Sequence, residues 1–175
     1  MNGATIVATK SRGSNDGSRD AFRPQTLRTL RLILAALVAM ADLIAKAWAQ
    51  STLSHGKMLW IWKPWVQLML LHNRGAMLGI GANVPAVVVV VSMVGVGVLI
   101  YWIWRDGIGA TGAAIMLGGG VGNLASRLAN GYVTDFIHVT FWPGVFDLAD
   151  VALRAGALVG LFALWQHSRR AQSSA

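Results

Sequence analysis

Long hydrophobic segments separated by polar stretches dominate this chain. Four of them run roughly from Leu27 to Trp48, from Val84 to Trp104, from Ile108 to Ala129 and from Phe146 to Trp165. Each is close to the ~20 residues that a helix needs to cross a ~30 Å hydrocarbon core. The pattern predicts an all-α membrane protein with four transmembrane helices.

The stretches around residues 49–83 and 131–145 are the two long connections of this pattern. Val66 to Leu71 is apolar apart from Gln67, and residues 131–136 alternate between apolar and polar side chains. Both features are typical of extended backbone. We therefore expect a small β-containing region on one side of the membrane.

Tryptophans gather in the first of these connections, at Trp60, Trp62 and Trp65, close to Trp48 at the end of the preceding segment. An aromatic belt at the membrane–water interface accounts for them. A more specific interpretation is a short strand or surface helix that lies on the bilayer and receives a lipid-linked substrate.

Composition supports the membrane assignment. The 175 residues are 55% hydrophobic and only 13% charged, whereas soluble domains carry roughly a quarter charged residues. The chain has no cysteine, which excludes disulfides, thiolate catalysis and Cys-based metal sites.

The net charge of +8 comes largely from basic residues near the two chain ends: Lys10, Arg12, Arg19, Arg23, Arg28, Arg31, Arg169 and Arg170. This distribution indicates a positive-inside orientation rather than nucleic-acid binding. With Arg105 and Asp106 at a cytoplasmic turn, both termini lie inside, and the two long connections are extracytoplasmic. We expect a disordered cytoplasmic tail over 1–25, a four-span domain over 26–168 and a C-terminal tail over 169–175.

Ionisable groups inside membrane spans are expensive and usually functional. Asp42 and Lys46 are four residues apart and share a helix face. They are either a mutually neutralising pair or a support for a neighbouring polar site, and both interpretations stay open. Asn123 and Arg127 have the same spacing, and we expect Arg127 to anchor acids or carbonyls.

Two further acids, Asp135 and Asp150, lie at the two ends of the second long connection. Asp147 is placed to cap the last helix, which puts Asp150 at the third helical position, four residues before Arg154. A helix cap with an ion pair would explain Asp150 alone. Pairing with Asp135 predicts acid–base chemistry, because two adjacent carboxylates in a low-dielectric site cannot both stay ionised.

Other catalytic classes find little support in the sequence. No Gly-x-Ser-x-Gly motif is present, and the four histidines are scattered without the spacing of metal ligands on one helix. We therefore expect neither a metal nor a cofactor.

In their order along the chain, these motifs resemble the bacterial lipoprotein signal peptidases (signal peptidase II). The matching boxes are Asp42 with Lys46; Asn73-Arg74-Gly75-Ala76-Met77-Leu78-Gly79; Gly122-Asn123-Leu124-Ala125-Ser126-Arg127 followed by Gly131-Tyr132-Val133-Thr134-Asp135-Phe136; and Phe146-Asp147-Leu148-Ala149-Asp150. The resemblance covers about Leu27 to Trp165.

The resemblance implies an aspartic peptidase of the bacterial inner membrane with its active site at the extracytoplasmic interface. Its substrates would be diacylglyceryl-modified prolipoproteins, cut before the lipidated cysteine, and its partners would be those signal peptides and membrane phospholipid. Asp135 and Asp150 would be the catalytic pair, and the residues that bind substrate or support the site would be Asp42, Lys46, Asn73, Gly75, Asn123, Arg127 and Asp147.

Two positions depart from the family pattern. Ser126 replaces an Asp, and Asp147 replaces an Asn. We hypothesise that Asp147 forms an ion pair with Arg127. The departures leave open a non-catalytic homologue that binds lipidated peptides, and a small membrane carrier or oligomeric scaffold is a third alternative.

Overall fold

The computed structural model describes residues 17–53, 57–75 and 83–173. They form, in chain order, α1 (Gly17–Thr52), β1 (Leu59–Trp62), β2 (Val66–Asn73), α2 (Pro85–Trp104), α3 (Ala110–Asn130), β3 (Val133–Val139), β4 (Val145–Phe146) and α4 (Leu148–Ser173). The architecture is mostly helical with one small antiparallel sheet, as predicted.

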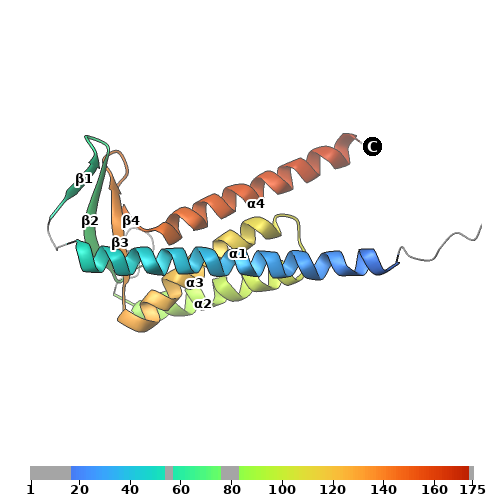
Figure 1. The fold of residues 1–175 in the computed structure, drawn as a ribbon, viewed down its shortest axis with the longest axis horizontal. Coiled ribbons are helices and arrows are strands. Elements are labelled where there is room, and N and C mark those ends of the chain that lie inside the picture. The colour runs from blue at the N-terminus through green and yellow to red at the C-terminus, as the bar shows by residue number, and fades with distance from the viewer. Residues whose placement is uncertain (1–16, 54–56, 76–82, 174–175) are drawn as a thin grey trace, which may run out of the picture.

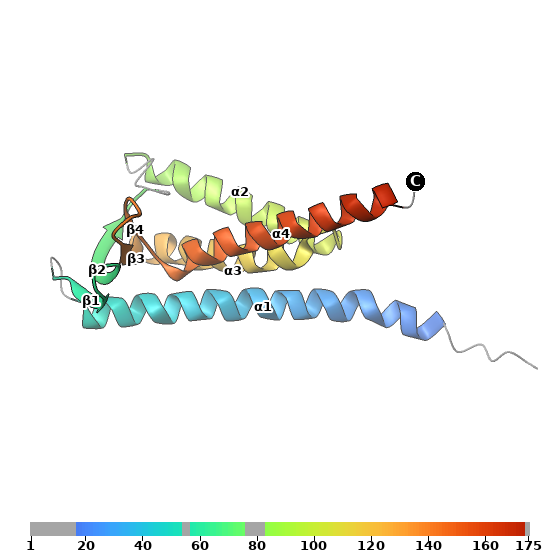
Figure 2. The same cartoon turned by 90° about the horizontal axis from the view of Figure 1, so that it is seen from above.

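The helices extend along the long axis of the molecule, and the sheet covers one end of them (Figures 1 and 2). The start of α1, the turn between α2 and α3 and the end of α4 lie at the opposite end (Figure 1). Helix α3 packs against α1, α2 and α4. The connections that carry the candidate acids therefore meet at the sheet end.

By length and apolar composition, three of the described helices could cross a membrane: Gln25–Thr52 within α1, Pro85–Trp104 and Leu148–Ser173. Helix α3 is less apolar because it carries several glycines together with Asn123, Ser126 and Arg127. Its neighbours bury about half of it, so much of α3 faces protein rather than lipid. Its role as a fourth span remains a prediction.

Helical backbone extends into both predicted tails. Helix α1 begins at Gly17, within the stretch that we expected to be disordered, and α4 continues to Ser173. Residues 1–16 of the predicted tail and Ala76–Gly79 of the second motif lie outside the described residues.

The sheet has the order β1-β2-β3-β4, with every neighbouring pair antiparallel. Strands β2 and β3 confirm the extended backbone predicted at Val66 and before Asp135. The sheet packs on the end of α1, where Ala49 and Leu53 form a buried cluster with Leu70 and Phe136. This contact sets the position of β3 relative to the helices.

Glycines let α3 approach its neighbours closely. A side chain at Gly119 would meet the carbonyl oxygen of Ala149 in α4, and one at Gly122 would meet the Asp42 carboxylate in α1. Small residues allow such close packing between membrane helices. The start of α4 and the polar face of α1 are thereby brought against the same stretch of α3.

Candidate active site

Asp150 is positioned by the cap of α4. The Asp150 amide donates a 2.7 Å hydrogen bond to Asp147 Oδ1, and α4 begins at Leu148. This is the predicted arrangement, in which a capping carboxylate accepts from an otherwise unpaired amide of the first turn. It leaves the Asp150 carboxylate partly buried at the N-terminus of α4, where the helix dipole favours negative charge.

Asp135 reaches the same place from the sheet. Helix α3 ends at Asn130 and is capped by Gly131, whose φ of +76° suits glycine, and β3 starts at Val133. Asp135 is 2% exposed, and its Oδ2 accepts a 3.0 Å hydrogen bond from Asn73 Nδ2 on β2. The pairing of β2 with β3 thus holds both side chains in register.

The structure brings Asp135 and Asp150 together with Asp147. One carboxylate oxygen from each of the three lies within 4.8 Å of the others. At this spacing, carboxylates can share a proton, a water molecule or a cation. Among the described residues, they form the one group of this kind.

The environment raises the pKa of Asp135 to about 7. Burial is the main cause, because it disfavours the charged carboxylate, and the negative charges of Asp147 and Asp150 add to it. The hydrogen bond from Asn73 acts in the opposite direction. Asp135 can therefore gain or lose a proton near neutral pH, as an acid–base group must.

Lys46 organises the polar side chains behind this pair. Its ammonium donates 2.5 Å and 2.8 Å hydrogen bonds to Asp42 Oδ2 and Asn123 Oδ1, and it lies 2.8 Å from Asp147 Oδ2. Asp42 Oδ1 in turn accepts from the amide of Ala149. Asp42 and Lys46 thus neutralise each other, and they also contact Asp147 and the start of α4, so their support of the acid site stays a prediction.

Arg127 binds backbone rather than an acid. It donates a 2.7 Å hydrogen bond to the carbonyl of Gly75, and Asn73 Oδ1 accepts the Gly75 amide. This contact matches the expectation that Arg127 anchors acids or carbonyls. It also links the second motif, at Gly75, to α3. The hypothesised ion pair between Arg127 and Asp147 is wrong, because Asp147 pairs with Lys46.

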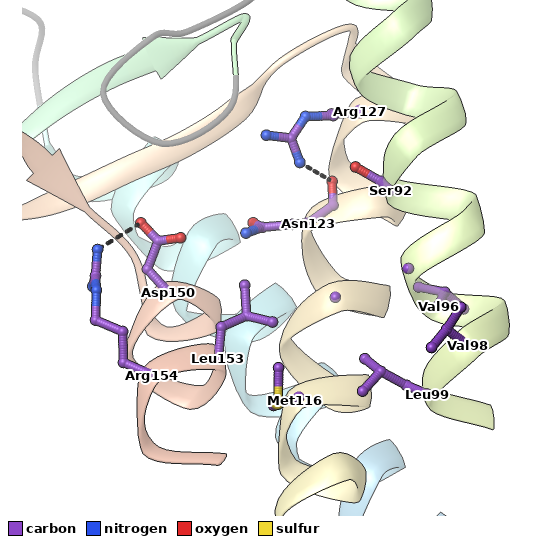
Figure 3. A pocket seen from close by; sticks show the side chains of 12 residues that line it. Ser92, Val96, Val98, Leu99, Met116, Asn123, Arg127, Asp150, Leu153 and Arg154 are labelled. Atoms are coloured by element: carbon purple, nitrogen blue, oxygen red, sulfur yellow. Dashed lines mark hydrogen bonds and ion pairs between the residues drawn. The ribbon is translucent and has the colours of Figure 1, made fainter. Parts of the chain in front are cut away.

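A cavity of about 540 Å³ opens beside Asp150 and is lined by residues of α2, α3 and α4 (Figure 3). Asp150, Asn123 and Arg127 line its polar part. Its larger, apolar part is lined by residues such as Val96, Leu99, Met116 and Leu153. A second apolar cavity of about 370 Å³ continues along the same helices and shares Leu99 and Met116. Together they form a mainly apolar groove with Asp150 at one end.

Part of the lining of this cavity was not predicted from the sequence. Ser92 lines it from α2, and Leu153 lines it from α4. Ser92 could have been found, because it is the one hydroxyl side chain within the long run of valines. Leu153 gives no such signal, since only the packing of α4 distinguishes it from its neighbours.

Comparison with known proteins supports the family resemblance. Residues 34–166 match the family described as Signal peptidase (SPase) II. A lipoprotein signal peptidase of Moorella thermoacetica is 35% identical over 133 residues, which span 73% of this chain and 87% of that protein. A lipoprotein signal peptidase of Rhodococcus jostii is 31% identical over 144 residues, spanning 75% and 70%.

Solved structures share the fold. A bacterial membrane enzyme determined at 2.3 Å superposes with a TM-score of 0.73 at 21% identity, over 80% of this chain and 90% of that one. A second, determined at 1.9 Å, gives 0.70 at 22% identity, over 78% and 92%.

Proposed function

The chain belongs to the signal peptidase II family, and we propose that it is a membrane aspartic endopeptidase that removes signal peptides from diacylglyceryl-modified prolipoproteins. Asp135 and Asp150 are its catalytic pair. The observation that carries the proposal is the meeting of these two carboxylates, from β3 and α4, at the end of an apolar groove.

The chemistry follows from one proton shared by two acids. The ionised carboxylate takes a proton from water as the water oxygen attacks the scissile carbonyl carbon, and the protonated carboxylate stabilises the carbonyl oxygen by a hydrogen bond. The carboxyl group that took the proton from water then gives it to the departing amide nitrogen as the C–N bond breaks. The raised pKa of Asp135 supports a pair that holds one proton near neutral pH.

The groove is the proposed binding site for a lipid-linked peptide. Its apolar walls, from α2 and α4, suit acyl chains or the hydrophobic segment of a signal peptide, and Asp150 lies at its polar end. Arg127 and Asn123 line the same end, where a peptide backbone needs hydrogen-bond partners (Figure 3). A substrate that enters sideways from the bilayer would thus present its scissile bond to the acids.

The distribution of charge supports the orientation that we propose, in which four helices span the bacterial inner membrane and both termini lie on its cytoplasmic side. Arg28, Arg31 and Arg105 belong to the end of the molecule opposite the sheet, where α4 also ends with Arg169 and Arg170. Basic residues favour the cytoplasmic side. The acid pair and the sheet would then lie at the extracytoplasmic interface.

The test is cleavage of a lipid-modified precursor by the purified full chain in detergent or liposomes, followed by gel shift. Wild type should yield mature product, whereas Asp135→Asn and Asp150→Asn should each accumulate precursor at normal protein levels. Asp106→Asn is the matched control, because it makes the same change at the far end of the molecule and should process normally.

Unchanged cleavage in both acid variants would overturn the assignment of the catalytic pair. Binding of the lipidated precursor by wild type, without any cleavage, would identify a non-catalytic homologue instead. The departures at Ser126 and Asp147 are what keep that alternative worth testing.

A further inference from the structure

Asp147 lies where α1 meets the start of α4, and its side chain is completely buried. The family resemblance implies Asn at this position. An additional buried acid beside the acid pair would be expensive unless the structure compensates its charge. The contacts of its two oxygens show how the structure does so.

Each oxygen of Asp147 has a separate partner. Oδ1 accepts the amide of Asp150 and so fixes the first turn of α4. Oδ2 lies 2.8 Å from the ammonium of Lys46, which also binds Asp42 and Asn123. One short side chain therefore connects a cation of α1 directly to the backbone of a residue in the acid pair.

We propose that Asp147 is a positioning residue of this enzyme that also sets the pH range of the acid pair. Through Oδ1 it holds Asp150 in place, and through its charge, which Lys46 balances only in part because Lys46 also pairs with Asp42, it raises the pH at which the pair carries one proton. The proposal rests on the proposed function and deepens it. It distinguishes this chain from relatives with Asn at the same position.

Charged groups face Asp147 from four elements. They are Asp42 and Lys46 on α1, Arg127 on α3, Asp135 on β3, and Asp150 with its neighbour Arg154 on α4. The acids repel the Asp147 carboxylate, and the cations attract it. Lys46 is the cation in direct contact, so it is the partner that the experiment must separate from the rest.

Asp147→Asn is the decisive variant, because an amide oxygen can still accept from Asp150 while the negative charge is gone. We expect cleavage to survive and the whole pH–rate profile to move to lower pH by about one unit. The direction follows from electrostatics: loss of a nearby negative charge, with Lys46 still paired with Asp42, makes both acids of the pair lose protons more easily. Asp147→Ala should show the same shift with weaker cleavage at every pH, since the cap is also lost.

A profile that does not move in Asp147→Asn would overturn the proposal. Asp106→Asn controls for removal of an acid elsewhere and should leave the profile unchanged. Failure of the proposed function itself would look different, because wild type would then not cleave the precursor at any pH.

A second measurement tests the link to Lys46. Lys46→Met leaves two buried carboxylates without a cation, and adding Asp147→Asn removes one of them. The double variant should therefore be recovered folded in higher yield than Lys46→Met alone. A double variant no better than Lys46→Met would show that the two side chains do not act as a pair.

Discussion

The two ends of this molecule contain charge clusters in which the signs of the charges are exchanged. At the sheet end, one cation, Lys46, lies between two acids, Asp42 and Asp147, and all three are buried. At the other end, one acid, Asp106, lies 2.6 Å from both Arg28 and Arg31, with 28% of the Asp106 side chain exposed. Similar partners at similar distances thus occur in different dielectric surroundings.

The two ends shift the pKa values of their acids in opposite directions, downwards for Asp106 and upwards for Asp135. The arginines lower the pKa of Asp106, chiefly through the hydrogen bond from Arg28. At the sheet end, burial raises the pKa of Asp135 to about 7 in spite of its hydrogen bond from Asn73. The exposed cluster links α1 to the turn after α2, whereas Asp135, beside the buried cluster, can hold a proton near neutral pH.

The largest effect is expected from breaking the buried cluster. Lys46→Met leaves Asp42 and Asp147 without their cation, and removal of one partner from a buried ion pair typically destabilises by about 3–5 kcal/mol. Thermal unfolding in detergent should show a large loss of stability together with loss of precursor cleavage. Arg31→Met is the matched control, and an equal loss in both variants would contradict the comparison.

The next largest effect is expected from Asp135→Asn, because protonation of Asp135 contributes to the stability of the folded chain. Its pKa is higher in the folded chain than the ordinary value of 3.8, so its contribution to stability is fully present below about pH 4 and is lost as the pH rises through about 7. At 1.36 kcal/mol per pH unit, the loss amounts to about 4 kcal/mol. Asp135→Asn should therefore be inactive yet more stable than wild type at pH 7.5.

The measurement for Asp135→Asn is unfolding at a series of pH values. The gain over wild type should shrink steadily towards pH 4. A gain in stability that is independent of pH, or no gain at all, would show that folding does not raise the pKa of Asp135.

A moderate effect is expected where α3 supports the acid site. Gly119→Ala places a methyl group against the carbonyl oxygen of Ala149, at the start of α4. Overpacking of this kind costs about 1–3 kcal/mol and should displace Asp150, so cleavage should fall as well. Gly97→Ala is the control, because nothing lies within 4 Å of that position and alanine favours the helix. Equal behaviour of the two variants would show that the approach of α3 to α4 is not tight.

The smallest effect belongs to the exposed cluster. Asp106→Asn removes the ion pairs with Arg28 and Arg31, but solvent and salt screen these charges. We expect a slight fall in the unfolding temperature at pH 7 and low salt. Because the pKa of Asp106 is lowered, this difference should vanish as the pH falls below about 4. A difference that persists in acid or in high salt would point to a role other than the ion pairs.

Prediction from sequence succeeded where the cause is local. The cap by Asp147 and the place of Asp150 in the first turn follow from spacing along one helix. The strand around Val66 and the extended backbone before Asp135 follow from alternation and turn signals. The helical backbone between Gly17 and Gln25 was not foreseen, because polar composition does not show whether a long helix continues beyond the membrane.

Contacts between distant segments were harder to predict. The partner of Asp147 is Lys46 rather than Arg127, and nothing in the spacing of charges distinguishes the two cations. The cavity beside Asp150 includes Ser92 from α2, which no motif connects to the acids. Such choices depend on which helix faces meet, and that is a property of packing.

By itself, the sequence determined the apolar segments, the small sheet and the presence of acids at the ends of one connection, because hydrophobic period, turn residues and caps act over a few residues. Only the tertiary structure decided which charges meet. Close packing at Gly119 and Gly122 brings α4 and α1 onto the same face of α3, and the sheet carries Asp135 to them. In a low-dielectric interior, that placement decides which charges are balanced and which carboxylates keep their protons.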